Sequence, residues 1–275
     1  MAFTTADVVK LRKATGAGMM DCKNALTDAD GDFEKAVQII REKGKLVASK
    51  RSEREASEGV TLAKVTGDKS QGVIIVLNCE TDFVAKNENF IAFAGSILDL
   101  ALENRATSLE EVKSLSLDGR PVIDQVVEQT GVIGEKIELS YFSKVEAETV
   151  AAYVHPGNKL STIVGFNKPD VDAQVAKDIA MQIAAMSPVA VDKAGVPDDV
   201  VNKELEIAKE KYRLEGKPEA MLDKIAQGAL NKWFKESTLL NQDYVKDAKI
   251  SVREFLAQAD KTLEVTGFDR YSLNL

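Results

Sequence analysis

The chain is built around Val73-Ile74-Ile75-Val76-Leu77-Asn78-Cys79-Glu80-Thr81-Asp82-Phe83-Val84-Ala85-Lys86-Asn87. Its first five residues are all apolar and mostly β-branched, a composition typical of a strand that is buried on both faces. We therefore expect a sheet to pass through this part of the chain.

The polar residues that follow predict a short connection, from Asn78 to Asn87, between this strand and a helix. Such connections lie on the surface. Within it, the apolar pair Phe83 and Val84 comes directly after Thr81 and Asp82, short polar residues that can cap a helix. Two interpretations follow. Phe83 either folds under the connection as part of the core, or is an exposed apolar wedge that a capped turn presents to a partner.

Length and composition limit the classes of function. The chain has 275 residues, enough for two or three compact units. Its net charge of −8 argues against nucleic acid or an anionic membrane as the main partner, so a protein or small molecule is expected. Without a long apolar run or a signal-peptide pattern, we expect a cytoplasmic protein. Cys22 and Cys79 are far apart, which fits a reducing cytosol without disulfides or zinc, and no cofactor is expected.

Three short helices are expected before residue 45, forming a small bundle. Thr4 and Asp7 resemble a capping box at the start of the first helix, which should end near Gly16. The second helix covers Met19 to Leu26, and the third should begin after Asp32. By area scaling the core of such a bundle is small.

The third helix is expected to stop at Gly44. The polar and charged segment from Lys45 to Gly59 then predicts a flexible tether that hinges the bundle to the rest of the chain. Residues 1–52 would thus form the first domain. Met20 lies between the apolar positions of its helix and is either a core filler or an exposed contact of the adaptable kind that methionine makes at interfaces.

The next unit, residues 53–145, carries the expected order strand, strand, helix. A strand at Val60–Val65 is followed by a turn, by the buried strand and by a helix from Asn89 to Asn104. Residues 105–135 show a second helical rhythm that ends at Gly131 or Gly134.

A weak internal repeat appears in the last unit, residues 146–275. Val150–Val154, a turn at residues 155–158, Leu160–Phe166 and a helix around Ile179 repeat the order strand, turn, strand, helix. Where the first copy has the Phe83 motif, the second has Lys168-Pro169-Asp170. The wedge is therefore not needed to build the unit, which favours the exposed interpretation of Phe83.

Two charged helical stretches at about 198–236 predict an antiparallel helical hairpin inserted into this last unit. A short helix near Val252–Leu256 and a final strand, Leu263–Leu273, should close the chain and join the second sheet. The expected inner face of the hairpin pairs four residues of each helix: Val201, Leu205, Ala208 and Tyr212 with Leu222, Ile225, Ala229 and Trp233. The expected fold class is α+β, with a bundle of the ubiquitin-associated (UBA-like) type and two repeated subdomains.

Two long motifs carry a family resemblance. The chain reads LRKATGAGMMDCKNAL at residues 11–26 and NCETDFVAK at residues 78–86. Together they resemble the bacterial elongation factor Ts family, and the likeness extends over almost the whole chain. The resemblance implies a guanine-nucleotide exchange factor that binds elongation factor Tu and promotes GDP release during translation elongation. It leaves open a homodimer or a 2:2 complex.

The same resemblance implies site residues. The motif around Phe83 would disturb the Mg²⁺ and phosphate site of the partner, with Phe83 entering near the Mg²⁺ and Asp82 helping to shift the structure. The residues implied at the Mg²⁺ site are Thr81, Asp82, Phe83 and Val84, and the other implied contacts are Arg12, Met19 and Met20 with the nucleotide domain and Tyr153, His155 and Gly157 with the third domain of the partner. From the residues alone, His155 is equally a plain turn residue.

Two departures from the family pattern stand out. Val76 lies where the family usually has an acidic residue, and the sequence stops at Leu275, where some members continue into a C-terminal helix that touches the partner. That contact is expected to be missing.

We expect a binding protein and not an enzyme. His155 is the only histidine, which excludes catalytic histidine pairs and multi-histidine metal sites. The alternative to an exchange factor is a non-catalytic adaptor or scaffold with a ubiquitin-associated-type bundle.

Overall fold

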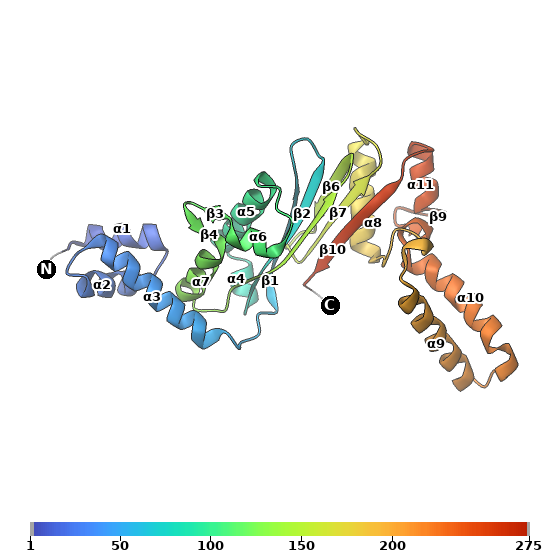
Figure 1. Ribbon diagram of the computed structural model, residues 1–275, viewed down its shortest axis with the longest axis horizontal. Coiled ribbons are helices and arrows are strands. Elements are labelled where there is room, and N and C mark those ends of the chain that lie inside the picture. The colour runs from blue at the N-terminus through green and yellow to red at the C-terminus, as the bar shows by residue number, and fades with distance from the viewer. Residues whose placement is uncertain (1–2, 274–275) are drawn as a thin grey trace.

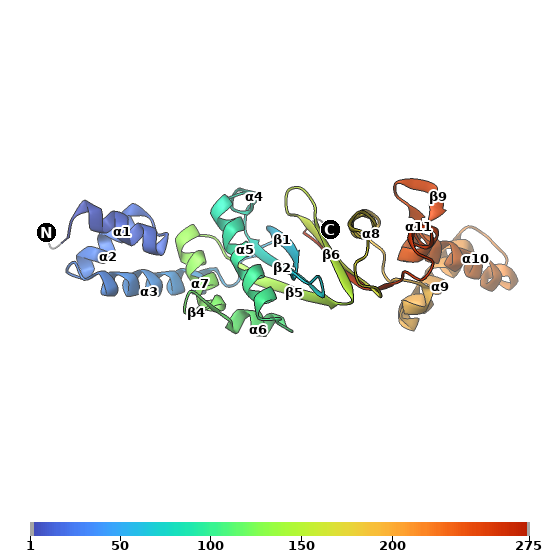
Figure 2. The same cartoon turned by 90° about the horizontal axis from the view of Figure 1, so that it is seen from above.

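Residues 3–273 are described by a computed structural model and form an elongated molecule (Figure 1). A helical bundle lies at one end, two sheets with their helices occupy the middle, and a helical hairpin projects from the other end. Seen from above, the same order holds along the long axis (Figure 2).

The N-terminal bundle consists of α1 (Thr5–Thr15), α2 (Met19–Asp28) and α3 (Phe33–Arg51). Thr4 and Asp7 form the predicted capping box at the start of α1. The bundle has its own apolar cluster, separate from that of the sheets, in which Leu11, Cys22 and Leu26 are fully buried.

The predicted stop of α3 at Gly44 is wrong, because the helix continues to Arg51 and buries Gly44. The predicted tether is therefore wrong from Lys45 to Arg51, and only residues 52–57 separate α3 from the first strand. A glycine inside a helix costs about 1 kcal/mol relative to alanine. Here α3 packs against α7 (Val122–Ile133), and this tertiary contact overrides the propensity.

The first sheet is antiparallel in the order β1-β2-β5, formed by β1 (Glu58–Val65), β2 (Gln71–Cys79) and β5 (Glu138–Glu146). Every residue of β2 is buried, which confirms the strand predicted at Val73–Leu77. Ile75 points into the cluster formed with the helices, whereas Ile74 points into a cluster shared with the second sheet.

Helices cover one face of this sheet. Its third strand, β5, was not among the strands predicted from the sequence. The elements between β2 and β5 are α4 (Asp82–Ala85), α5 (Glu88–Glu103), α6 (Leu109–Ser114), β3 (Ser116–Leu117), β4 (Arg120–Pro121) and α7. The predicted helix at Asn89–Asn104 is α5, and α7 ends before Gly134, one of its two predicted stops.

The second sheet repeats the first. Its order is β10-β7-β6, formed by β6 (Thr149–Val154), β7 (Leu160–Phe166) and β10 (Val265–Ser272), and α8 (Ala173–Met186) packs on it. The predicted repeat of strand, turn, strand and helix is confirmed, as is the final strand that joins the second sheet. In each sheet the third strand comes from later in the chain.

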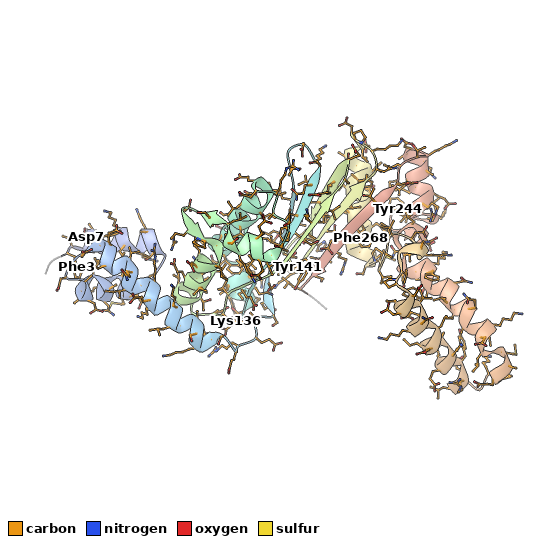
Figure 3. All side chains as sticks on the ribbon, viewed as in Figure 1. Phe3, Asp7, Lys136, Tyr141, Tyr244 and Phe268 are labelled. Carbon is orange, nitrogen blue, oxygen red and sulfur yellow. The ribbon has the colours of Figure 1, made fainter. Side chains whose placement is uncertain are left out.

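The two sheets pack on each other in the middle of the molecule. Ile74 lies against Val150 and Ile163 at this contact. Tyr141, which Figure 3 labels between the sheets, donates a 2.6 Å hydrogen bond from its hydroxyl to Asp269 of β10. The two sheets are therefore joined by apolar packing and by a hydrogen bond.

The predicted hairpin is present as α9 (Asp198–Leu214) and α10 (Glu219–Ser237) (Figure 1). Its predicted inner face is buried or half-buried throughout, but the most buried positions of α10 are Leu222, Ala226 and Leu230. The remaining elements are two 3₁₀ turns (Lys193–Gly195 and Leu239–Asn241), β8 (Asp243–Tyr244), β9 (Asp247–Ser251) and α11 (Val252–Ala259). Within residues 3–273, no helix combines the length and apolarity needed to cross a membrane.

Candidate partner-binding site

Phe83 lies on α4, a single helical turn that follows the buried strand β2. Its side chain is 83% exposed, so the interpretation of Phe83 as core is wrong. Its neighbours fill the core instead. Ala85 and Phe90 are buried, and Val84 packs partly against the cluster of the first sheet.

The turn from Thr81 to Lys86, hereafter the Phe83 turn, is not held by the predicted side-chain cap. Thr81 occupies the N-cap position of α4 but makes no capping hydrogen bond. Its hydroxyl donates instead to Glu135 Oε1 at 2.6 Å. The backbone N–H groups of Glu80 and Thr81 donate to Glu135 Oε2 at 3.1 and 3.0 Å.

Glu80, directly before the Phe83 turn, makes a second set of hydrogen bonds that hold this part of the chain in place. Its carboxylate accepts the backbone N–H of Lys136 at 2.6 Å, Arg51 at 2.8 Å and Arg54 at 3.1 Å. These donors, led by the N–H of Lys136, lower the pKa of Glu80 to about 2. Two carboxylates thus fix the Phe83 turn to the loop after α7 and to the end of α3.

Sequence reasoning missed Glu80 and Glu135 as functional residues. They are 55 positions apart in the chain, and acidic residues are common in a chain with 29% charged residues. Only Glu80 lies inside a quoted motif, and no pattern connects it to Glu135.

Asp82 lies on the surface of the turn and forms an ion pair of 2.6 Å with Lys86, four residues along the chain. The hydrogen bond from Lys86 lowers the pKa of Asp82, and the charge of Lys159 adds to this effect. The carboxylate is thus ionised and accessible beside Phe83.

The predicted contact residues of the bundle lie on its surface. Met20 is 65% exposed and Met19 38% exposed, so the interpretation of Met20 as a core filler is wrong. Arg12 is also exposed. Gly16, between α1 and α2, lines a groove of about 450 Å³ together with Phe83 and Val132. The bundle and the Phe83 turn therefore share one groove.

Tyr153, His155 and Gly157 occur at the β6–β7 turn. The Tyr153 hydroxyl and His155 Nδ1 form a hydrogen bond of 2.8 Å. His155 is nevertheless exposed to solvent. This turn lies against β1, because the N–H of Thr61 donates to the carbonyl of Asn158 at 2.8 Å. β1 also contacts α4, which carries Phe83. The structure therefore places the Phe83 turn and the turn with His155 on elements that both lie against β1.

Over the part of the chain that the structure describes, no group of three or more histidine, cysteine, aspartate and glutamate side chains is placed to hold a metal ion. The arrangement is an exposed apolar side chain with fixed polar neighbours, which suits binding to another macromolecule.

Comparison with known proteins gives the family. The family model for elongation factor Ts matches residues 80–274. Elongation factor Ts of Azobacteroides pseudotrichonymphae is 50% identical over 275 residues, covering all of both chains. That of Christiangramia forsetii is 51% identical over 272 residues, or 98% of each chain, and that of Porphyromonas gingivalis is 50% identical over all of this chain and 99% of its own. The chain belongs to the elongation factor Ts family.

Membership in the elongation factor Ts family assigns the role of nucleotide exchange factor for elongation factor Tu in translation elongation, as the resemblance predicted. The family model begins at Glu80, directly before the Phe83 turn, whereas the relatives also align over the N-terminal bundle. The elongation factor Ts likeness therefore includes every element described above. None of these comparisons supports the alternative of a non-catalytic adaptor or scaffold.

Proposed function

We propose that this chain releases GDP from elongation factor Tu by inserting the side chain of Phe83 beside the Mg²⁺ and phosphate site of the partner. GTPases hold nucleotide through a phosphate-cradling loop and Mg²⁺, and an apolar side chain placed there disturbs both. The observation that carries the proposal is the exposure of Phe83 on a turn that Glu135 and Glu80 hold in place. Thr81 and Val84 fix the turn, and the carboxylate of Asp82 helps to shift the structure of the partner.

No chemical bond is made or broken in this mechanism. The free energy comes from burial of Phe83 in the partner, about 1.5–3 kcal/mol for a side chain of this size. Because coupling between two ligands is reciprocal, GDP must weaken the complex as much as the complex weakens GDP binding.

The other contacts act as anchors on either side of Phe83. Arg12, Met19 and Met20 would meet the nucleotide domain of elongation factor Tu, and the turn with Tyr153, His155 and Gly157 would meet its third domain. The exposure of all three bundle residues and of His155 supports this assignment. We further propose a cytoplasmic protein with a UBA-like bundle (1–52) and two core subdomains (53–145 and 146–275), acting as a homodimer or in a 2:2 complex.

The test is Phe83→Ala, measured by stimulated GDP release and by thermal unfolding. Removing an exposed side chain should leave the melting temperature nearly unchanged, while release slows about tenfold or more, since each 1.4 kcal/mol is a factor of ten. The matched control is Phe90→Ala, because Phe90 is buried and its loss should cost about 3–5 kcal/mol of folding stability. Unchanged release by a folded Phe83→Ala protein would refute the proposal.

A further inference from the structure

Two glycines face each other where α3 of the bundle crosses α7. A Cβ atom built on Gly131 would lie 2.3 Å from the Cα of Gly44, whereas ordinary contacts begin at 3.4 Å. The reverse is not true. A Cβ built on Gly44 would have the Cα of Gly131 as its nearest neighbour, at 3.7 Å. The close approach of the two helices therefore requires glycine at position 131, whereas position 44 has room for a methyl group.

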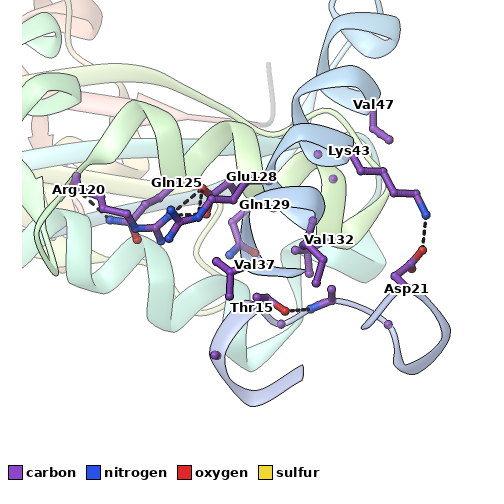
Figure 4. Close-up of a pocket in the computed structure, with 18 of the residues that line it drawn as sticks. Thr15, Asp21, Val37, Lys43, Val47, Arg120, Gln125, Glu128, Gln129 and Val132 are labelled. Atoms are coloured by element: carbon purple, nitrogen blue, oxygen red, sulfur yellow. Dashed lines mark hydrogen bonds and ion pairs between the residues drawn. The ribbon is translucent and has the colours of Figure 1, made fainter. Parts of the chain in front are cut away.

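Charged side chains hold the crossing together (Figure 4). Arg120 donates to both oxygens of Glu128 at 2.6 and 2.7 Å, and Arg41 of α3 lies 3.3 Å from the same carboxylate. Farther along α3, the ion pair of Arg51 with Glu80 forms a second attachment. Two attachments of the bundle to the core thus lie along α3, and the second of them, at Glu80, also belongs to the contacts that hold the Phe83 turn.

The crossing is not packed on all sides. A cavity of about 330 Å³ lies beside it, lined by Thr15 and Val37 of the bundle and by Gln129 and Val132 of α7 (Figure 4). A tilt of α3 at the crossing would therefore meet few packed side chains.

We infer that Gly131 is a positioning residue, which sets the angle of the N-terminal bundle relative to Phe83 so that both reach one partner molecule. The methyl group added by Gly131→Ala would lie 2.3 Å from the Cα of Gly44, so the two helices must move apart until this contact exceeds 3.0 Å. The bundle then rotates about the second attachment at Arg51. The start of α3, Phe33, lies eleven residues from Gly44, about 16 Å along the helix, so the displacement grows toward Arg12 and Met20. This inference rests on the proposed insertion of Phe83.

The experiment uses the full chain with spin labels on cysteines at Glu34 and Glu103, two exposed positions on α3 and α5. The two native cysteines, Cys22 and Cys79, are fully buried, so the spin labels should attach to the two introduced cysteines. The distance distribution between the labels is measured in the free protein for Gly131→Ala, with Gly44→Ala as the control at the same crossing. Gly228→Ala on α10 is a second control, because a Cβ there meets no atom within 4 Å.

The expected result is a shifted or broadened distribution for Gly131→Ala only. In GDP release from elongation factor Tu, this variant should need about fivefold or more protein for half-maximal stimulation, a coupling of ordinary size. Both controls should match the parent protein. A distribution equal to that of Gly44→Ala, or a changed distribution with unchanged release, overturns the inference.

Gly44→Val keeps the test decisive if Gly131→Ala does not fold. A Cβ at this position already touches the Cα of Gly131 at 3.7 Å and Glu128 at 3.8 Å, so the two methyl groups of valine, which extend beyond the Cβ, should push α3 away from α7 and give the same shift. An unchanged distribution in Gly44→Val would overturn the inference. The distance measurement needs no exchange activity, so a failure of the Phe83 proposal is recognised separately, by unchanged release in Phe83→Ala.

Discussion

Glu135 is the residue that gives Phe83 a fixed position. Its carboxylate accepts three hydrogen bonds, from the N–H of Glu80 and from the N–H and hydroxyl of Thr81. Hydrogen bonds to an ionised acceptor are about twice as strong as neutral ones. The turn therefore keeps its shape before a partner arrives.

The first prediction is that Glu135→Gln loosens the Phe83 turn without unfolding the chain. The loss of charge should weaken the turn by about 1–3 kcal/mol, so amide exchange at residues 80–86 should become faster and stimulated GDP release slower. Glu138→Gln is the matched control, since Glu138 is exposed and its carboxylate lies 3.2 Å from Lys136 instead of bonding to the Phe83 turn. Equal amide exchange in the two variants would contradict the role of Glu135.

Glu80 predicts a pH dependence of folding stability. Its pKa is about 2 in the folded chain instead of the usual 4.5, because the N–H of Lys136 and two arginines stabilise the carboxylate. The folded state binds the proton less readily than the unfolded state. The contribution to stability is therefore present above pH 4.5 and is lost as the pH falls toward 2.

The measurement compares thermal unfolding of the parent chain and Glu80→Gln between pH 7 and pH 2, both in the same buffers. The difference in melting temperature should be largest at neutral pH and should shrink below pH 4.5. A difference that stays constant over this range would show that Glu80 is not held as a carboxylate by these donors.

Among the elements, the α9–α10 hairpin is the one farthest from the Phe83 turn (Figure 1). Its two helices pack on each other, and α9 has no buried residue. The hairpin joins the core through Val189, whose N–H donates to the carbonyl of Ser237 at 2.8 Å, and through the bridge between Ala190 and Thr238.

We predict that the hairpin does not contribute to exchange. Replacing residues 199–235 with a short Gly-Ser link keeps both attachments, so GDP release should stay within about twofold of the parent value, under 0.5 kcal/mol. Any self-association should change, as light scattering would show. A folded replacement that fails to release GDP would place the hairpin in the exchange interface.

At the scale of the whole molecule, the bundle and the sheets are separately packed bodies with a fixed contact. The apolar cluster of the bundle shares no residue with that of the first sheet. The contact between them includes the crossing of α3 with α7, the approach of Gly16 to Val132 and the pair of Arg51 with Glu80. Removal of the bundle should therefore leave the sheets folded.

The corresponding prediction is that deletion of residues 1–52 preserves the circular dichroism of the sheets but sharply reduces stimulated GDP release. The deletion also removes Arg51, so Arg51→Gln in the full chain is the control for the lost ion pair. Release should fall far more in the deletion than in the control. Full exchange by the shortened protein would show that Arg12, Met19 and Met20 are not needed.

Local patterns in the sequence were sufficient for much of the fold. Val73–Leu77 is apolar without interruption, and such a run is stable only when both faces are covered. The capping box of Thr4 and Asp7 acts within four residues, and the repeat of strand, turn, strand and helix is visible in the order of apolar segments. The family motifs likewise lie in continuous stretches.

Contacts between segments far apart in the sequence decided the features of the fold and of the site that local patterns did not predict. Gly44 looks like a helix stop in the sequence, yet α3 continues because Gly131, far along the chain, lets α7 approach it. Phe83 could have been core or surface by its sequence. It is exposed because Ala85 and Phe90 fill the interior while Glu135 holds the turn outward. Burial and close approach depend on which surfaces meet, and a local pattern carries no information about a neighbour 50 or more residues away.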